Sequence, residues 1–120
     1  MLHGIGGHQD TAAGARLTII TVPLYRKKNP IVREKVTTIT TPGDVVDAIV
    51  TNEGIAINPR RKDLIEKVKG KLNIIPIEEL KDMAYNATGK PVELDLTEKT
   101  VGIVKWIDGT VLDVIKKVKE

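Results

Sequence analysis

Branched aliphatic side chains are almost the only material from which this 120-residue chain can build a hydrophobic core. It contains 15 Ile, 13 Val and 9 Leu, whereas Phe is absent and the aromatic residues are one Trp and two Tyr. Together with 12 Thr, the β-branched residues occupy a third of the chain, and such side chains favour strands over helices. The composition therefore argues against a disordered chain and against an all-helical bundle.

The composition also excludes several functional classes. The chain has no Cys, which excludes disulfides, thiolate nucleophiles and Cys-ligated zinc. No apolar run approaches the roughly 18 residues of a membrane span, and no leader peptide is visible, so we expect a cytoplasmic protein with no membrane partner. The excess of 19 Lys and Arg over 16 Asp and Glu is small and stacking aromatics are few, so we expect no nucleic-acid partner.

Segments rich in Val, Ile and Thr alternate with turn signals along the chain, which predicts several short strands. The strongest hairpin signal is Asp108-Gly109, because a type I′ turn needs positive φ at both central positions. A polar basic loop is expected at 25–30, a turn at 42–44 and a linker at 90–98. The predicted strands are 17–22, 31–41 with a kink, 45–51, 55–57, 72–75, 100–107 and 110–118.

Two helices are predicted between these strands. The first begins at Asn58-Pro59, where Asn caps and Pro takes the first helical position, and it ends at Gly70. The second begins at Pro76 and ends at Gly89. Their apolar stripes at helical spacing are Leu64, Ile65 and Val68 in the first and Ile77, Leu80 and Ala84 in the second. This order of elements predicts one α/β domain with a mixed sheet and flanking helices.

The Gly/Ala-rich stretch 4–14, GIGGHQDTAAG, is the first candidate site. Successive glycines can adopt positive φ, so that the N–H groups of Gly6 and Gly7 converge on an anion or an oxyanion. His8 is a candidate acid–base group, and Asp10 is placed to cap a short helical turn. A plain tight turn would explain the same residues. Only three residues precede the stretch, whereas a ligand-binding turn normally follows a strand, so we expect the chain to begin inside a domain.

Two further stretches carry candidate side chains. Glu53, in the turn Thr51-Asn52-Glu53-Gly54, has the position of a nucleophile or base at a strand end, or of a solvated carboxylate. Arg60 and Arg61 fall on the predicted first turn of a helix, where cations oppose the helix dipole. That misfit suggests that they bind a carboxylate or phosphate or form an intersubunit salt bridge, and the alternative is an exposed basic turn.

Four segments of the sequence strongly resemble the citrate lyase α-subunit family, and the resemblance covers nearly all of the chain. They are GIGGHQDTAAGARLTIITVPL, PIVREKVTTITTPGDVVDAIVTNEGIAINPRR, IPIEEL and WIDGTVLDVI. The most specific motifs are GGHQDTAAGA and VTNEGIAINPRRKDL. The resemblance implies a CoA-transferase-like (NagB/RpiA-like) α/β fold, of which residues 1–120 form most of the C-terminal domain, truncated at its N-terminal side.

The family resemblance implies a transferase activity within a lyase complex. The acetyl group on the CoA-like phosphopantetheine arm of an acyl-carrier (γ) subunit leaves as acetate, and citrate takes its place to give citryl thioester. A β subunit then cleaves citryl thioester to oxaloacetate and acetyl thioester. The implied partners are the β and γ subunits, the rest of the α subunit and citrate, in an oligomer, and this chain alone is expected to be inactive. No metal site is expected.

The resemblance also assigns roles to particular residues. The Gly-x-Gly-Gly of CoA-transferases, followed three residues later by Asp, corresponds to Gly4, Gly6, Gly7 and Asp10. The later Thr-Glu-Tyr-Gly-type element corresponds to Thr51-Asn52-Glu53-Gly54, where the acidic residue is shifted by one place; the family's nucleophilic glutamate is expected outside this chain. Oxyanion donors are then the N–H groups of Gly6 and Gly7, with His8 in catalysis. Candidate citrate ligands are Arg60 and Arg61, followed by Arg16 and Arg26.

Two alternatives remain open at this stage. One is a CoA-transferase or acyl-CoA hydrolase that acts on another carboxylate. The other is a non-catalytic assembly module that keeps the fold without the chemistry.

Overall fold

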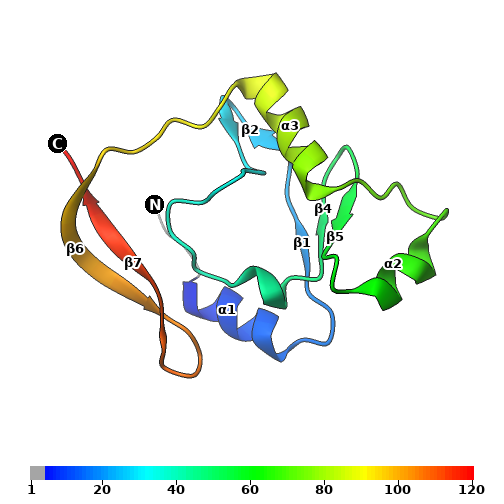
Figure 1. The fold of residues 1–120 in the computed structure, drawn as a ribbon, viewed down its shortest axis with the longest axis horizontal. Helices are drawn as coiled ribbons and strands as arrows, with labels where there is room; N and C mark the ends of the chain where they lie inside the picture. Colours follow the sequence, from blue (N-terminus) through cyan, green and yellow to red (C-terminus); the bar gives the residue numbers. More distant parts are fainter. Residues whose placement is uncertain (1–4) are drawn as a thin grey trace. The chain divides into compact units, whose positions relative to one another are not determined.

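The computed structural model describes residues 5–120 as a mixed α/β chain of two compact units, drawn in Figure 1. Unit 1 comprises Met1–Arg16, Val36–Val45 and Val92–Glu120. Unit 2 comprises Leu17–Lys35 and Val46–Pro91. Chain length predicted a single domain, and the structure divides the chain into these two units. No helix among residues 5–120 is long and apolar enough to span a bilayer.

Unit 2 contains a three-stranded mixed sheet in the order β1-β4-β5. Strand β1 (Ile19–Thr21) runs parallel to β4 (Ala48–Val50), and β4 runs antiparallel to β5 (Ile55–Ile57). The strands predicted at 17–22, 45–51 and 55–57 are therefore confirmed, with only three residues of each in the ladder. The predicted strand at 72–75 is reduced to one parallel bridge between Ile55 and Ile74.

Two helices follow this sheet in unit 2. Helix α3 (Ile77–Thr88) has Pro76 at its N-cap and Gly89 at its C-cap and buries the predicted stripe of Leu80 and Ala84. Helix α2 (Lys62–Val68) starts later than predicted, with Arg61 as its N-cap. Asn58 instead stabilises the turn before the helix, because its Oδ1 accepts the Arg60 N–H at 3.2 Å. Arg60 and Arg61 consequently precede α2.

A two-stranded hairpin occupies the segment expected to be a basic loop. Strand β2 (Tyr25–Arg26) pairs antiparallel with β3 (Asn29–Pro30), and a two-residue loop joins them. The Ile31 N–H donates to Leu24 O at 2.8 Å and continues the pairing. The buried cluster next to this hairpin is the core of unit 2, formed by Leu24, Val32, Ala56, Leu80 and Ala84.

Unit 1 contains helix α1 (Ile5–Gly14), the short 3-10 helix η1 (Gly43–Val45) and a long hairpin of β6 (Leu96–Lys105) and β7 (Val111–Val118). The hairpin is confirmed, but its turn is not type I′. Of Asp108 and Gly109, the pair predicted at the centre of the turn, only Gly109 has positive φ, at 87°. The Gly109 N–H donates to Trp106 O at 2.9 Å, and the Asp108 carboxylate accepts the Thr110 N–H at 2.9 Å. A turn with one left-handed glycine therefore replaces the expected pair of left-handed residues.

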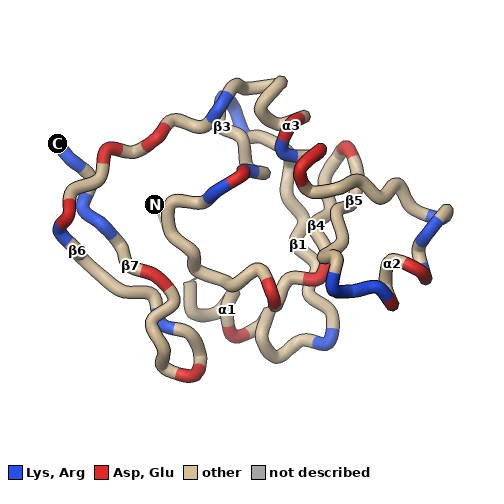
Figure 2. Tube along the Cα trace, viewed as in Figure 1, with Lys and Arg blue, Asp and Glu red and all other residues tan. Residues whose placement is uncertain are grey.

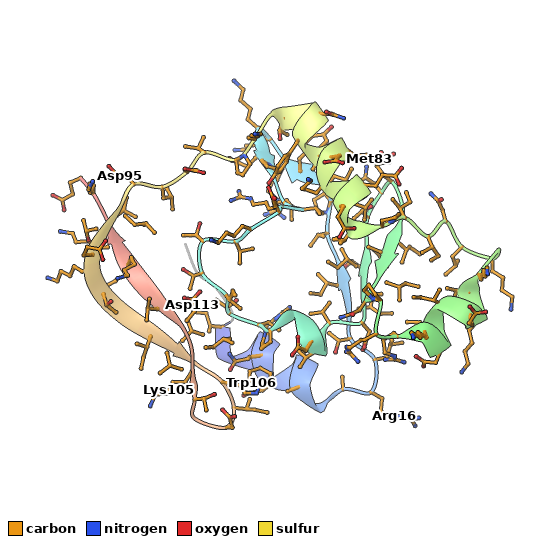
Figure 3. All side chains as sticks on the ribbon, viewed as in Figure 1. Arg16, Met83, Asp95, Lys105, Trp106 and Asp113 are labelled. Atoms are coloured by element: carbon orange, nitrogen blue, oxygen red, sulfur yellow. The ribbon has the colours of Figure 1, made fainter. Side chains whose placement is uncertain are left out.

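The predicted strand 31–41 is wrong, because this segment has no ladder partner. Its backbone groups bond to side chains in unit 1: the Ile39 N–H donates to Asp113 Oδ2 at 2.7 Å, and Thr40 O accepts from Gln9 Nε2 at 2.9 Å. Asp113, labelled in Figure 3, lies on β7. The Val and Thr content of this segment suits a strand. However, its backbone groups at Ile39 and Thr40 find side-chain hydrogen-bond partners, so these groups need no neighbouring strand.

Candidate functional site

A hollow of about 630 Å³ lies at the carboxyl ends of the parallel strands β1 and β4 in unit 2. The carboxyl ends of parallel strands are the usual place for ligands in α/β folds, since they form one edge from which loops rise. Two segments supply the lining: Thr21, Val22, Pro23, Leu24 and Tyr25 after β1, and Val50, Thr51 and Asn52 at the end of β4.

The turn after β4 is held rigidly by the Thr51 side chain. Its Oγ1 accepts the N–H groups of Glu53 at 3.2 Å and Gly54 at 3.1 Å, and its hydroxyl donates to Gly54 O at 2.8 Å. A Cβ on Gly54 would collide with the Ile75 side chain and lie 3.3 Å from Asn73 O, so a larger residue here would require Ile75 to move. The tight turn predicted at 52–54 is confirmed, and it fixes one wall of the hollow.

Asn52 and Glu53 differ in how they contact this hollow. Asn52 lines it and joins its two walls, because its Oδ1 accepts the Leu24 N–H at 3.4 Å. The exposed Glu53 side chain accepts a hydrogen bond from Asn52 Nδ2 at 3.0 Å and lies beside the lining. A carboxylate at this strand end is placed as the sequence predicted, and its catalytic role stays a prediction.

The arginines bind a carboxylate of this chain. Asp47 Oδ1 accepts Arg60 Nη2 at 2.8 Å and Arg61 Nη1 at 2.9 Å, while its Oδ2 accepts the Thr18 N–H at 2.7 Å. Only 4% of the Asp47 side chain is exposed. Burial raises the pKa of this carboxyl, but the Thr18 N–H and the two guanidinium groups outweigh that effect and lower the pKa below its ordinary value.

Arg61 also forms a two-pronged contact with Asp63, through Nε and Nη2 at 3.0 Å each. This hydrogen bonding lowers the pKa of Asp63 to about 2. Because the Arg61 guanidinium faces two carboxylates, a citrate carboxylate would have to compete with both. Arg60 keeps 46% of its side chain exposed and is the better candidate of the two. Citrate binding by either arginine stays a prediction. The carboxylate of Asp47 already provides both arginines with an acidic partner within the chain.

Residues 5–14 of the Gly-rich stretch form helix α1, so the tight turn with positive φ expected there is wrong. Gly6 and Gly7 lie in the first turn of α1, and neither is among the described residues with positive φ. Asp10 lies inside α1 and does not cap it, and Gly4 falls outside the described residues. The first N–H groups of a helix have no intrahelical acceptor and carry partial positive charge, so this end of α1 can still present donors to an anion.

His8 and Gln9 hold α1 against residues 40–41 of unit 1. His8 Nδ1 lies 2.7 Å from Thr41 Oγ1, and the buried Gln9 donates to Thr40 O. The predicted site residues thus separate into two groups. Gly6, Gly7, His8, Asp10 and Arg16 belong to unit 1, whereas Arg26, Glu53, Arg60 and Arg61 belong to unit 2.

Sequence reasoning missed Asp47 and Asn52. The signal for Asp47 was present, because a carboxylate inside the apolar run 45–50 must find buried partners once that run becomes a strand. Asn52 lines the hollow from a turn that was predicted, but its bond to Leu24 joins segments 28 residues apart, which no local pattern reports. Within residues 5–120, no group of three or more His, Cys, Asp or Glu side chains is arranged to hold a metal ion.

Comparison with known proteins gives consistent matches. The family model described as citrate lyase, alpha subunit (CitF), matches residues 1–118. Citrate lyase alpha chains of Klebsiella pneumoniae and Haemophilus influenzae are 51% and 47% identical over 115 and 116 residues, which is 95% and 96% of this chain. This chain spans only 23% of the length of each of these relatives. A crystal structure described as the alpha subunit of citrate lyase from Streptococcus mutans in complex with citrate matches with a TM-score of 0.92 and 43% identity, over 95% of this chain and 22% of that one.

Proposed function

Because the chain belongs to the citrate lyase α-subunit family, we propose that it is part of a subunit that exchanges carrier-bound acetyl for citrate. Acetyl thioester and citrate give citryl thioester and acetate. One thioester and one free carboxylate are consumed and one of each is formed, so no oxidant or reductant is needed. The observation that carries the proposal is the family match over residues 1–118.

The proposed substrates are citrate and an acyl carrier with a CoA-like phosphopantetheine arm. The structural relative from Streptococcus mutans was solved with citrate, which supports citrate as the carboxylate. In this proposal the chain supplies most of a C-terminal CoA-transferase-like domain and works with the rest of an α subunit and with β and γ subunits in the cytoplasm. Since it corresponds to 23% of its curated relatives, we expect the 120 residues alone to show no exchange.

The hollow in unit 2 is the proposed place for the arm. A pantetheine-type arm is a thin chain of amide and methylene groups. The lining offers apolar surface from Val22, Pro23 and Leu24 with hydroxyl and amide groups from Thr21, Thr51 and Asn52. Such a mixture of many apolar contacts and few polar groups is typical of small-molecule sites.

The N-terminal end of α1 is the proposed oxyanion site. Attack on a thioester carbonyl places negative charge on its oxygen, and preorganised N–H donors stabilise that charge; the loss of one donor costs roughly 3 kcal/mol in other enzymes. Gly6 and Gly7 bring such N–H groups without side chains, and a Cβ built on either meets no atom of residues 5–120 within 4 Å apart from its chain neighbours and the helix backbone.

The exchange can be tested in a chimera in which this segment replaces the matching part of the Klebsiella pneumoniae α chain. Citrate-dependent release of labelled acetate from acetyl carrier is measured, with the isolated 120-residue chain alongside. We expect release by the chimera and none by the isolated chain. A folded chimera that binds the carrier without releasing acetate would contradict the proposed function.

Gly7→Val in the chimera tests the oxyanion site. We expect turnover to fall about 100-fold or more, because the added side chain keeps the thioester oxygen from the N–H groups. Gly7→Ala and Gly14→Ala are a matched pair: both add a methyl group to α1 in open space, at opposite ends of the helix. Only Gly7→Ala should slow turnover. Equal rates for the pair would refute the oxyanion assignment and leave the exchange function standing.

A further inference from the structure

The β2–β3 hairpin concentrates positive charge beside the hollow of unit 2. Arg26, Lys27 and Lys28 are consecutive and exposed. Within residues 5–120 the ion pairs involve other side chains, so these three cations have no acidic partner there. Figure 2 shows the blue segment at this hairpin. A cluster of three unpaired cations on one tight turn attracts an anion of more than one charge.

The backbone of Lys27 is unusual for a lysine. Lys27 and Lys28 form a two-residue hairpin loop, and Lys27 has a φ of 56°. No other non-glycine residue in the described part of the chain has a positive φ, so the φ of Lys28 is negative. Positive φ at the first position alone is the pattern of a type II′ turn, where glycine is strongly preferred. A side chain kept at a strained position points to a use for that side chain.

The residues on both sides of the charged turn are buried in the core of unit 2. Leu24 precedes the hairpin and belongs to the buried cluster with Leu80 of α3. Pro30 ends the hairpin and is fully buried, and β3 contacts α3. The three cations are thus presented from a fixed base, which lowers the entropy lost when they bind a ligand.

The hollow begins where the hairpin begins. Tyr25 lines the hollow and is the first residue of β2, and Arg26 follows it directly. The lining itself includes no charged side chain. A ligand that suits both features has an uncharged, thin portion for the hollow and an anionic end for the hairpin.

We propose that Arg26, Lys27 and Lys28 bind the phosphate groups of the substrate's pantetheine-type arm while its uncharged portion lies in the adjoining hollow. The guanidinium can donate two parallel hydrogen bonds to phosphate oxygens, and the lysines add point charges. This inference rests on the proposed function for the identity of the arm. It goes further in assigning residues to the anionic end.

The test is calorimetric titration of the complete chain with three probes: coenzyme A, pantetheine, which lacks phosphate, and inorganic pyrophosphate. The test variant combines Arg26→Gln, Lys27→Gly and Lys28→Gln. Lys27→Gly relieves the positive-φ strain, so this variant should melt no lower than the parent chain. The control variant removes the same charge from exposed positions on and after α2, through Lys67→Gln, Lys69→Gln and Lys71→Gln.

We expect coenzyme A to bind the test variant about tenfold more weakly or worse, with a reduced dependence on salt. Pantetheine should bind the test variant and the parent chain equally, and the control variant should match the parent with all probes. Equal coenzyme A affinity in the test variant and the parent would overturn the inference. So would pyrophosphate that binds as tightly as coenzyme A, since the hollow would then contribute nothing.

The chimera separates this inference from the proposed function. The test substitutions should raise the KM for acetyl carrier about tenfold and leave kcat unchanged, because the reacting thioester is at the other end of the arm. If the hairpin substitutions weaken coenzyme A binding but the chimera shows no exchange, the inference stands and the proposed function fails. If exchange proceeds with an unchanged KM, the function stands and the inference fails. The carrier protein is also tested without its arm. If it binds as tightly as the carrier with the arm, the hairpin binds the protein and not the phosphate groups, and the inference is overturned.

Discussion

The two units of this chain are stabilised in different ways. Every member of the buried aliphatic cluster, Leu24, Val32, Ala56, Leu80 and Ala84, belongs to unit 2, although the strands of that unit are only two or three residues long. Unit 1 has the longest strands, β6 and β7, yet among its described residues the buried apolar side chains are Ala12 and Val104. A unit can thus have the longer hydrogen-bonded strands and still have the smaller buried core.

The difference has consequences for stability and for the proposed site. Burial of apolar area is the dominant favourable term in folding, so unit 2 should be the more stable unit and should hold the hollow rigidly. In unit 1, buried Gln9 and the exposed His8 fasten α1 to residues 40–41 through single hydrogen bonds. Each such bond contributes about 1 kcal/mol, so unit 1 should open more readily.

The largest expected effect is that of Leu80→Ala in unit 2. Leu80 has no exposed surface, and its truncation should lower the free energy of unfolding of unit 2 by about 3–5 kcal/mol. The chain offers separate probes, because Tyr25 and Tyr85 lie in unit 2 whereas its single Trp, Trp106, lies in unit 1 (Figure 3). Urea unfolding followed by tyrosine signals should shift strongly, and the tryptophan signal should shift less.

Val104→Ala is the reciprocal change. It removes two methyl groups from a 2%-exposed position of unit 1 and should cost about 1–2 kcal/mol, seen first by Trp106. If both probes move together in both variants, the two units unfold as one and the comparison between them is wrong.

Asp47→Asn should have the next largest effect. Replacing a buried carboxylate leaves two guanidinium groups without their shared partner, and we expect a loss of about 2 kcal/mol in the stability of unit 2. Asp63→Asn removes a carboxylate from the same Arg61 at an exposed position, where solvent screens the pair, and should cost clearly less than Asp47→Asn. Equal losses in urea titrations would mean that burial of Asp47 adds nothing to its pairing.

Acid should weaken unit 2 through the same carboxylates. The pKa of Asp63 falls from 3.8 to about 2 in the folded chain, and that of Asp47 is also lowered. A carboxyl with a lowered folded pKa contributes stability that is present above its unfolded pKa and is lost as the pH falls through its folded pKa. The urea concentration at the tyrosine-detected unfolding midpoint should therefore decrease as the pH is lowered from 5 to 2. In Asp47→Asn this decrease should be smaller. An identical slope in that variant would contradict the assignment.

Local patterns in the sequence predicted the elements whose signals are local. Helix α3 was found from its Pro76 and Gly89 ends and its buried stripe, and the β6–β7 hairpin from Asp108-Gly109. The β-branched content predicted strands, and the order of the elements predicted a mixed sheet. Segment 31–41 was assigned wrongly because its partners are the side chains of Gln9 and Asp113, which lie far away in sequence.

The candidate site was predictable only in part. Thr51-Asn52-Glu53-Gly54 was identified as a turn, and the hollow beside it exists because β1 and β4 happen to be parallel neighbours, which the sequence does not state. The Gly-rich stretch was identified as a candidate, but its glycines are helical, because flanking residues such as Gln9 and Ala12 bury and fasten the helix. Arg60 and Arg61 were singled out as ligands of a carboxylate or phosphate; in the structure both bind the Asp47 carboxylate, and citrate binding stays a prediction.

The smallest expected effect on stability is that of Ile103→Thr on the hairpin of unit 1. Ile103 pairs with Val114 and is half exposed, and next to it Val101 is also exposed. We expect this apolar face to make the chain self-associate, so that sedimentation shows dimers or larger species.

Thr keeps the β-branched shape that suits a strand, so Ile103→Thr should change the free energy of unfolding by less than about 0.5 kcal/mol. It removes apolar surface from the face, and sedimentation should therefore shift towards monomer. Ile19→Thr is the matched control, since Ile19 is a half-exposed isoleucine on the edge strand β1 of unit 2. A parent chain that stays monomeric at low micromolar concentration would contradict self-association, and equal dissociation by Ile19→Thr would show that unit 1 is not its source.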